Sequence, residues 1–261
     1  MRQFSCVSYV KYVKYIILWF DFWHRAGGGL LLLGLSSLKT NAVNLNGIGM
    51  TSQRTRDRLL TRLIDRGIGC MRLLDVVRST PRHIFLDEAL AHKAYEDVAL
   101  PIGFNQTISQ PYIVAKMTEA ILNTGKFDRV LEIGTGCGYQ TAILAQLAKS
   151  VSTVERIKPL LERARKNLKL LKLRNIDFRH VDGSLGWENN GPYDAIIATA
   201  APQRVPEALL QQLASGGRLI IPVGGENNQR LQLITRDKSD FNVEVLEQVK
   251  FVPLLCGQLQ S

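Results

Sequence analysis

The sequence predicts an α/β fold: a three-layer sandwich with a mixed seven-stranded sheet, an antiparallel C-terminal hairpin and an N-terminal helical cap. Three observations lead to this fold class. Short apolar strands alternate with amphipathic helices from residue 129 onward. The first of these strands runs into a glycine-rich turn, Gly134-Thr-Gly-Cys-Gly, and a helix follows the turn. Two alternating apolar runs, 231–235 and 243–249, then follow one another as the arms of a hairpin do. This order of elements is typical of a Rossmann-like sheet.

The 261-residue chain has the composition of an ordinary globular protein and a formal net charge of +10. Residues 1–49 carry +4 of that charge, and the rest is spread over stretches of alternating sign. Such stretches are typical of solvated helix faces, so we expect no nucleic-acid partner. The four cysteines are far apart and form no Cys-x-x-Cys pair. This spacing predicts neither a metal site nor a disulfide framework, and it favours a cytoplasmic location.

Residues 1–49 differ from the rest of the chain. Their two apolar runs are interrupted by charged side chains, and neither reaches the ~18 apolar residues of a membrane span. Met50 begins a stretch typical of a protein start, so we interpret residues 1–49 as an extension that is disordered or belongs to a mis-assigned start. An interfacial membrane anchor is the alternative. We therefore expect no stable membrane insertion and one domain, 50–261, whose residues 50–112 form a helical cap.

Two helices begin this cap. Apolar residues at helical spacing predict a helix over 52–66, and a second helix over 71–78 stops before Pro81. A short helical patch follows over 85–95. The stretch 100–112 combines glycine and proline with hydroxyl and amide side chains. Either an ordered binding loop or a plain polar turn fits this composition.

The elements after the cap form a nucleotide cradle. Strand 129–133 leads through the glycine turn into a helix over 140–147, and strand 150–154 follows. Glycines allow a ligand to approach the backbone, and the helix start presents unpaired N–H groups. Glu155 ends the second strand, where a carboxylate can accept two hydrogen bonds from a ribose diol. An exposed glutamate at a strand end is the alternative, and the spacing after the glycine turn favours the diol role.

The remaining elements continue the alternation as helix 159–171, strand 176–181, strand 193–199, helix 207–213, a turn at 216–217 and strand 218–223. Asp182 and Gly183 follow the third strand, where Asp182 could accept a hydrogen bond from an adenine amino group and Gly183 would let the base approach. A dinucleotide dehydrogenase also has a glycine turn and a distal acid. This sequence lacks the Gly-x-Gly-x-x-Gly spacing and ends in a hairpin, so S-adenosyl-L-methionine is the expected cofactor.

Several motifs resemble those of the protein-L-isoaspartate O-methyltransferase family, which are class I S-adenosylmethionine-dependent enzymes. The most specific of them is the family's substrate loop. The resemblance covers about residues 50–256, on the segments 99–112, 130–142, 193–202, 216–224 and 249–254. Phe104-Asn105 departs from the family pattern, which has a smaller or more polar pair there, such as His-Gly.

The resemblance implies roles for particular residues. Ser109 corresponds to the active-site serine, and Thr107, Ile108 and Gln110 would shape the substrate site. The implied cofactor residues are Gly134, Thr135, Gly136, Glu155, Asp182, Gly183 and Thr199. A hydroxyl that caps the helix starting near Pro111 is the structural alternative for Ser109.

The resemblance also implies the reaction. A methyl group passes from S-adenosyl-L-methionine to the free α-carboxylate of L-isoaspartyl and D-aspartyl residues in damaged proteins and peptides, and a succinimide then forms. No metal takes part, and the enzyme is expected to be a monomer. Two alternatives remain at this point: a methyltransferase that acts on a small molecule or a nucleic acid, and a non-catalytic adenosyl-binding or membrane-associated protein.

Overall fold

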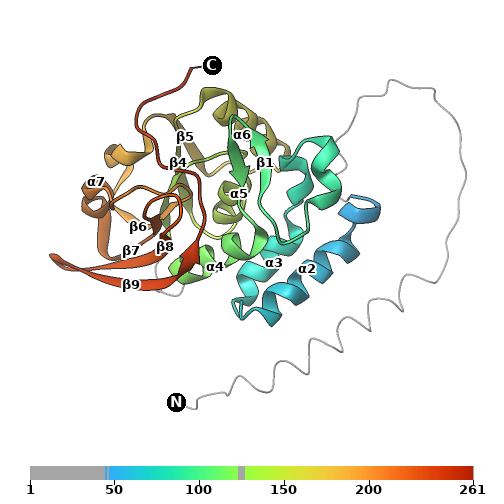
Figure 1. Cartoon of the computed structure of the whole chain (residues 1–261), viewed down its shortest axis with the longest axis horizontal. Helices are drawn as coiled ribbons and strands as arrows, with labels where there is room; N and C mark the ends of the chain where they lie inside the picture. The colour runs from blue at the N-terminus through green and yellow to red at the C-terminus, as the bar shows by residue number, and fades with distance from the viewer. Residues whose placement is uncertain (1–44, 46, 123–126, 261) are drawn as a thin grey trace, which may run out of the picture. The chain divides into compact units, whose positions relative to one another are not determined.

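The computed structural model describes residue 45, residues 47–122 and residues 127–260. The predicted extension 1–49 therefore lies almost wholly outside the described residues. The cap consists of two α-helices and three short 3-10 helices (Figure 1). Their bounds are η2 (Gly49–Thr51), α2 (Gln53–Asp65), α3 (Met71–Ser79), η3 (Arg82–Phe85) and η4 (Glu88–Lys93). Both predicted helices are confirmed, and each buries its apolar face, with Leu59 and Leu73 at most 1% exposed.

The stretch after the cap is a hairpin rather than an irregular loop. Strands β1 (Leu100–Gly103) and β2 (Gln106–Ile108) pair antiparallel, and α4 (Pro111–Leu122) follows. Phe104 and Asn105 form the two-residue turn with φ values of 53° and 55°. A turn with two positive φ angles matches the strand twist but usually contains glycine. The sequence therefore carried a weak signal for this hairpin.

One mixed sheet of seven strands organises the rest of the chain, in the order β5-β4-β3-β6-β7-β8-β9. The first five strands of this order are parallel, while β8 and β9 are antiparallel to their neighbours. The strands are β3 (Arg129–Ile133), β4 (Ser150–Glu155), β5 (Ile176–His180), β6 (Tyr193–Ala198), β7 (Leu213–Val223), β8 (Gln229–Asp237) and β9 (Asp240–Val249). The helices between them are α5 (Tyr139–Ala145), α6 (Lys158–Leu170), η5 (Gly183–Leu185), η6 (Glu188–Asn190) and α7 (Glu207–Gln211). The predicted fold class and terminal hairpin are confirmed.

Strand β7 is longer than the sequence predicts. It begins at Leu213, where a helix was expected, and it runs through Gly216 and Gly217, which were expected to form a turn. Gly216 has a φ of 75°, and the register with β6 shifts here. A Cβ on Gly217 would lie 2.8 Å from the Ala214 carbonyl oxygen. The two glycines thus form a bulge within a strand instead of ending an element.

Alternating side chains of the sheet enter two separate cores. Val130 on β3 belongs to the core shared with α4, α5 and α6, whereas Leu131 and Ile133 face the core shared with α7. This alternation is the expected period-two pattern of a strand buried on both faces. Helices therefore cover both faces of the sheet, which confirms the predicted sandwich.

The order of the sheet determines where a ligand can bind. From β3 the chain moves outward to β4 and β5, and it then returns to place β6 on the other side of β3. Loops that leave β3 and β6 diverge at this switch point and open a crevice beyond the carboxyl ends of the strands. None of the described helices combines the length and apolar character needed to cross a bilayer.

Candidate active site

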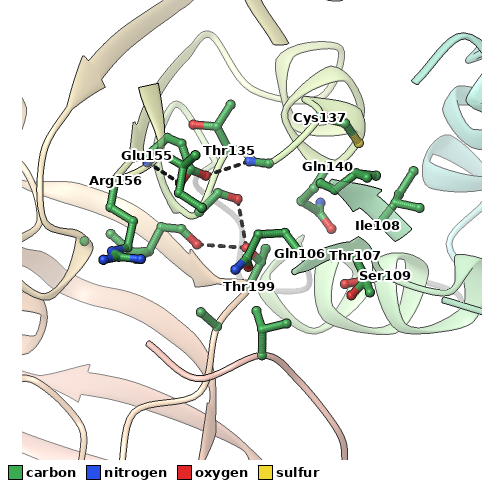
Figure 2. Close-up of a pocket in the computed structure, with 18 of the residues that line it drawn as sticks. Gln106, Thr107, Ile108, Ser109, Thr135, Cys137, Gln140, Glu155, Arg156 and Thr199 are labelled. Carbon is green, nitrogen blue, oxygen red and sulfur yellow. Dashed lines mark hydrogen bonds between the residues drawn. The ribbon is translucent and has the colours of Figure 1, made fainter. Parts of the chain in front are cut away.

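A pocket lies at the switch point, beyond the carboxyl ends of β3, β4 and β6. Figure 2 shows Glu155 and Arg156 on one side of it, the segment from Gln106 to Ser109 on the other, and Thr199 between them. Most of the predicted cofactor residues line it: Gly134, Thr135, Gly136, Glu155, Gly183 and Thr199. Thr107, Ile108 and Ser109 reach the same pocket from the β1–β2 hairpin and the segment after it.

The glycine turn after β3 requires glycine for two reasons. Gly134 has a φ of 92°, and a Cβ at this position would lie 2.4 Å from the Thr199 hydroxyl oxygen. That hydroxyl donates toward two carbonyl oxygens, those of Ile133 at 3.0 Å and Gly134 at 2.8 Å. Thr199 thereby joins the loop after β6 to the loop after β3. Because Gly134 has no side chain, the Thr199 hydroxyl can make these two hydrogen bonds and a ligand can approach the backbone of the turn.

Glu155 is buried and holds the glycine turn from the end of β4. One carboxylate oxygen accepts the Gly136 N–H and the other accepts the Ile157 N–H, both at 2.9 Å. Burial raises the pKa of Glu155, and the backbone N–H groups of Gly136, Ile157 and Arg156 oppose that effect. Each carboxylate oxygen has a second lone-pair direction, so Glu155 can still accept hydrogen bonds from a ribose diol in the pocket. The acid and the glycine turn fit the adenosyl group of the expected cofactor.

A second glutamate, Glu132, lies inside β3 and is fully buried. The hydroxyls of Thr141 and Thr153 donate to its Oε2 at 2.5 Å and 2.6 Å, while its Oε1 has no hydrogen-bond partner among the described residues. Burial raises the pKa of Glu132 to about 8 despite these two hydroxyls. The group therefore favours its protonated form inside the fold.

The Asp182 carboxylate accepts hydrogen bonds from its own loop and from the C-terminal segment. Its Oδ1 accepts the Ser184 N–H and hydroxyl, at 2.9 Å and 2.7 Å, and its Oδ2 accepts the Gly257 N–H at 2.6 Å. Burial acts to raise the pKa of Asp182, but these hydrogen bonds outweigh it and lower the pKa below its usual value. Asp182 thus ties the loop after β5 to the C-terminal segment, and its contact with adenine stays a prediction.

An acceptor groove adjoins the cofactor pocket, with a cavity volume of about 1060 Å³. Thr107, Ser109, Gln110 and Thr199 line it together with residues of the segment after β9. The Ser109 side chain makes no hydrogen bond within the part of the chain that the structure describes. The helix cap that was the structural alternative for Ser109 comes instead from Asp97, whose Oδ1 accepts the Tyr112 N–H at 2.9 Å. The Ser109 hydroxyl is therefore available to a ligand in the groove.

Two parts of the site escaped the sequence analysis. The first is the segment Val252–Leu255, which forms a wall of the cofactor pocket. It is held by mutual backbone hydrogen bonds of 2.8 Å, from Ala201 N–H to Val252 and from Leu254 N–H to Ala201. Most of this segment lies within the family-like stretch 249–254, but it contributes no polar side chain, so nothing in the sequence assigned it to the pocket.

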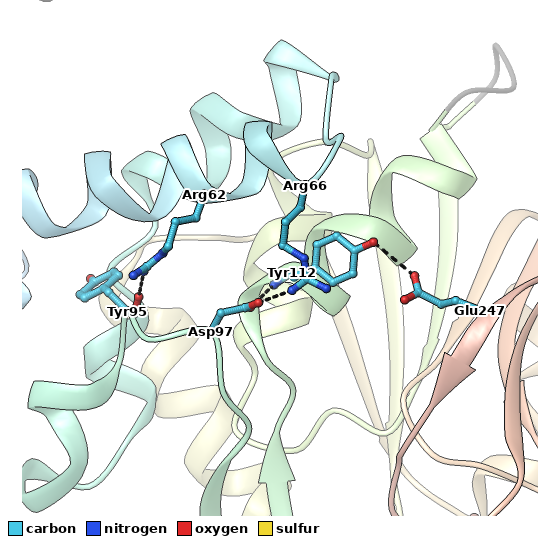
Figure 3. Close-up of polar contacts among 6 residues, drawn as sticks. All are labelled: Arg62, Arg66, Tyr95, Asp97, Tyr112 and Glu247. Atoms are coloured by element: carbon cyan, nitrogen blue, oxygen red, sulfur yellow. Dashed lines mark hydrogen bonds and ion pairs between the residues drawn. The ribbon is translucent and has the colours of Figure 1, made fainter.

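The second part is a polar network between the cap and β9 (Figure 3). Arg66 pairs with Asp97, and its guanidinium lies 3.3 Å from the centre of the Tyr112 ring. The Tyr112 hydroxyl donates to Glu247 on β9 at 3.4 Å. Arg66 and Glu247 both line the acceptor groove. These residues are far apart in sequence, and no local pattern indicates that they meet.

Comparisons with known proteins agree with this geometry. The family model described as protein-L-isoaspartate(D-aspartate) O-methyltransferase matches residues 54–259. The protein-L-isoaspartate O-methyltransferase of Cellvibrio japonicus is 61% identical over 217 residues, which cover 82% of this chain and 96% of that protein. The corresponding protein of Ectopseudomonas mendocina is 60% identical over 210 residues, which cover 80% of this chain and all (100%) of that protein.

A solved structure shares the fold. It is described as a Plasmodium falciparum protein-L-isoaspartate O-methyltransferase in complex with S-adenosyl-L-homocysteine. Its TM-score is 0.66 at 28% identity, with 77% of this chain and 98% of that chain covered. The methyl donor of the present protein is S-adenosyl-L-methionine, and its reaction is the methylation of isoaspartyl residues. The chain belongs to the protein-L-isoaspartate(D-aspartate) O-methyltransferase family.

Proposed function

We propose that Ser109 orients the free α-carboxylate of an isoaspartyl residue for methylation, with the peptide lying in the acceptor groove. The observation that supports this role is the Ser109 hydroxyl, which has no partner within the described residues and borders both the cofactor pocket and the groove. Thr107 borders both cavities as well and places a second hydroxyl at the junction, whereas the Thr199 hydroxyl there already donates to backbone carbonyl oxygens. Such a junction suits a carboxylate acceptor, because each of its oxygens can accept hydrogen bonds.

The remaining predicted residues divide between cofactor and acceptor. Gly134, Thr135 and Gly136 would hold the methionine part of the cofactor against the backbone, and Glu155 would bind its ribose diol. The adenine would lie near Asp182 and Gly183, while Thr199 would lie near the methyl group. Ile108 and Gln110 would shape the acceptor side. When bound, S-adenosyl-L-methionine supplies an activated methyl group.

The acceptor needs no general base. An α-carboxyl group has an unperturbed pKa of roughly 3.3–3.7, so it is ionised at neutral pH. Catalysis by this chain then consists of holding one carboxylate oxygen in line with the methyl group, an effect worth up to ~7–11 kcal/mol in favourable cases. A hydrogen bond from Ser109 orients the carboxylate but also withdraws charge from it, so we expect a moderate contribution. The backbone amide nitrogen of the linkage would then attack the methyl ester carbonyl and expel methanol to form a succinimide, and water would open this ring in part to normal aspartate.

The test uses the full chain with labelled S-adenosyl-L-methionine and two peptides that differ only in aspartyl or isoaspartyl linkage. We expect base-labile label in the isoaspartyl peptide alone. Ser109→Ala should lower kcat/KM for that peptide roughly 10- to 100-fold, the range for losing a hydrogen bond to a charged group. Ser79→Ala removes an exposed hydroxyl from the cap and serves as the control. Labelling of neither peptide would refute the substrate assignment.

Three further proposals rest on the sequence. We infer a monomer from the family resemblance, the absence of a nucleic-acid partner from the dispersed charge, and a cytoplasmic location from the scattered cysteines. Light scattering coupled to gel filtration tests the first, and fractionation of the full chain tests the last.

A further inference from the structure

Asp97 lies outside the family-implied site, in the connection between η4 and β1. Its side chain is 23% exposed and has two partners on different elements. One oxygen pairs with Arg66, which caps the end of α2, and the other accepts the Tyr112 N–H in the first turn of α4 at 2.9 Å. Asp97 therefore joins the cap to the start of α4 (Figure 3).

The start of α4 determines where Ser109 lies. Ser109 is three residues before Tyr112, and Pro111 between them fixes one backbone angle at the first helical position. The Gln110 carbonyl accepts the Val114 N–H at 3.2 Å, so the residue after Ser109 is already part of the helical hydrogen-bond ladder. Little backbone freedom separates the bond to Asp97 from the Ser109 hydroxyl.

We propose that Asp97 is a positioning residue for methyl transfer, which acts on the acceptor carboxylate through α4 and Ser109. This inference rests on the role proposed above for Ser109. A carboxylate at this place stabilises the helix start in two ways. It accepts a hydrogen bond from an otherwise unpaired N–H, and its negative charge interacts favourably with the positive end of the helix dipole. Arg66 holds the carboxylate in place, and its own position is set by stacking on the Tyr112 ring.

Replacing Asp97 should change kcat/KM for the isoaspartyl peptide but not the KM for S-adenosyl-L-methionine. Asp97→Ala frees the Tyr112 N–H and loosens the first turn of α4, so kcat/KM for the isoaspartyl peptide should fall about tenfold. The KM for S-adenosyl-L-methionine should stay within about twofold, because the glycine turn and Glu155 do not touch Asp97. Asp97→Asn keeps an oxygen that accepts the Tyr112 N–H, so it should restore kcat/KM to within about threefold of the wild type.

A double-mutant cycle separates positioning from a general effect on the fold. In a Ser109→Ala background there is no hydroxyl left to position, so adding Asp97→Ala should change kcat/KM by less than about threefold. Asp57→Ala is the matched control, since it removes an ion-paired aspartate of the same cap that contacts Arg78 and not α4. Circular dichroism of each variant at the assay temperature identifies any loss of folded protein.

The outcomes are distinguishable. An equal fall in kcat/KM on adding Asp97→Ala to the wild type and to Ser109→Ala would overturn the inference, and so would failure of Asp97→Asn to restore activity. If Ser109→Ala alone left kcat/KM unchanged, the role of Ser109 would fail, and that of Asp97 with it. The reaction itself would be refuted only if the wild-type chain labelled no isoaspartyl peptide.

Discussion

The buried Glu132 makes the stability of the fold depend on pH, and Glu132→Gln tests this dependence. Burial raises the pKa of Glu132 from 4.5 to about 8. Below pH 4.5 the carboxyl group is protonated in both the folded and the unfolded chain. Between pH 4.5 and 8 the unfolded chain loses the proton while the folded chain keeps it, so the free energy of unfolding falls as pH rises. Above pH 8 both states are ionised and the effect levels off.

The magnitude follows from the two pKa values. One pH unit of difference is worth 1.36 kcal/mol, so the span from 4.5 to about 8 corresponds to ~5 kcal/mol lost by pH 8. In Glu132→Gln the amide oxygen can still accept the hydroxyls of Thr141 and Thr153. The amide nitrogen then lies where Oε1 has no partner among the described residues, which is also where the proton of the wild-type carboxyl group lies at low pH. The variant should therefore be close to the wild type in stability at pH 5 and more stable at pH 8.

Urea unfolding at pH steps from 5 to 9 tests this expectation. The difference in the free energy of unfolding between variant and wild type should grow in favour of the variant as pH rises through this range. Glu155 is also buried, and its charge makes the smallest contribution to the Glu132 pKa, so the difference between variant and wild type includes the interaction of the two carboxyl groups. Glu188→Gln removes an exposed carboxyl group and serves as the control. A constant difference for Glu132→Gln would refute the reasoning.

Two further substitutions test the geometry of the site. Gly134→Ala should weaken S-adenosyl-L-methionine binding at least about tenfold in calorimetry, because its Cβ would lie 2.4 Å from the Thr199 hydroxyl at a φ of 92°. Gly69→Ala is the control, since a Cβ there meets no atom within 4 Å. Equal affinities of the two variants would contradict the prediction. Phe104→Asn should raise the Tm by about 2–4 °C, because asparagine tolerates the left-handed φ of 53° that costs phenylalanine ~1 kcal/mol. Phe241→Asn, also at an exposed phenylalanine but within β9, should bring no rise, and a similar gain there would refute the strain argument.

Elements that carry a clear hydrophobic period were predictable from the sequence. The strand 129–133 was predicted with the bounds that β3 has, because a continuous apolar run followed by glycine has few other conformations. The β1–β2 hairpin was missed because its turn uses Phe104 and Asn105, where tight turns usually contain glycine. The start of β7 was missed because Gly216 and Gly217 read as a turn, whereas they form a bulge.

Contacts of the site were less predictable than its residues. The spacing after the glycine turn indicated Glu155, but only the folded chain shows that its carboxylate already accepts the Gly136 and Ile157 N–H groups. Asp97 gave no signal because its partners come from α2 and α4, and their meeting depends on how the cap packs. Sequence patterns predict which side chains gather at a strand end, while long-range hydrogen bonds follow from packing that no local pattern contains.

The wall formed by Val252–Leu255 has a consequence for truncated chains. This segment is synthesised after all seven strands of the sheet, and it docks beside Ala201 by backbone hydrogen bonds. A chain that ended after β9 would contain every strand of the sheet but would lack one wall of the cofactor pocket. The sheet and the complete pocket therefore depend on different parts of the chain, and we expect a chain truncated after Val249 to keep the sheet but to bind the cofactor weakly.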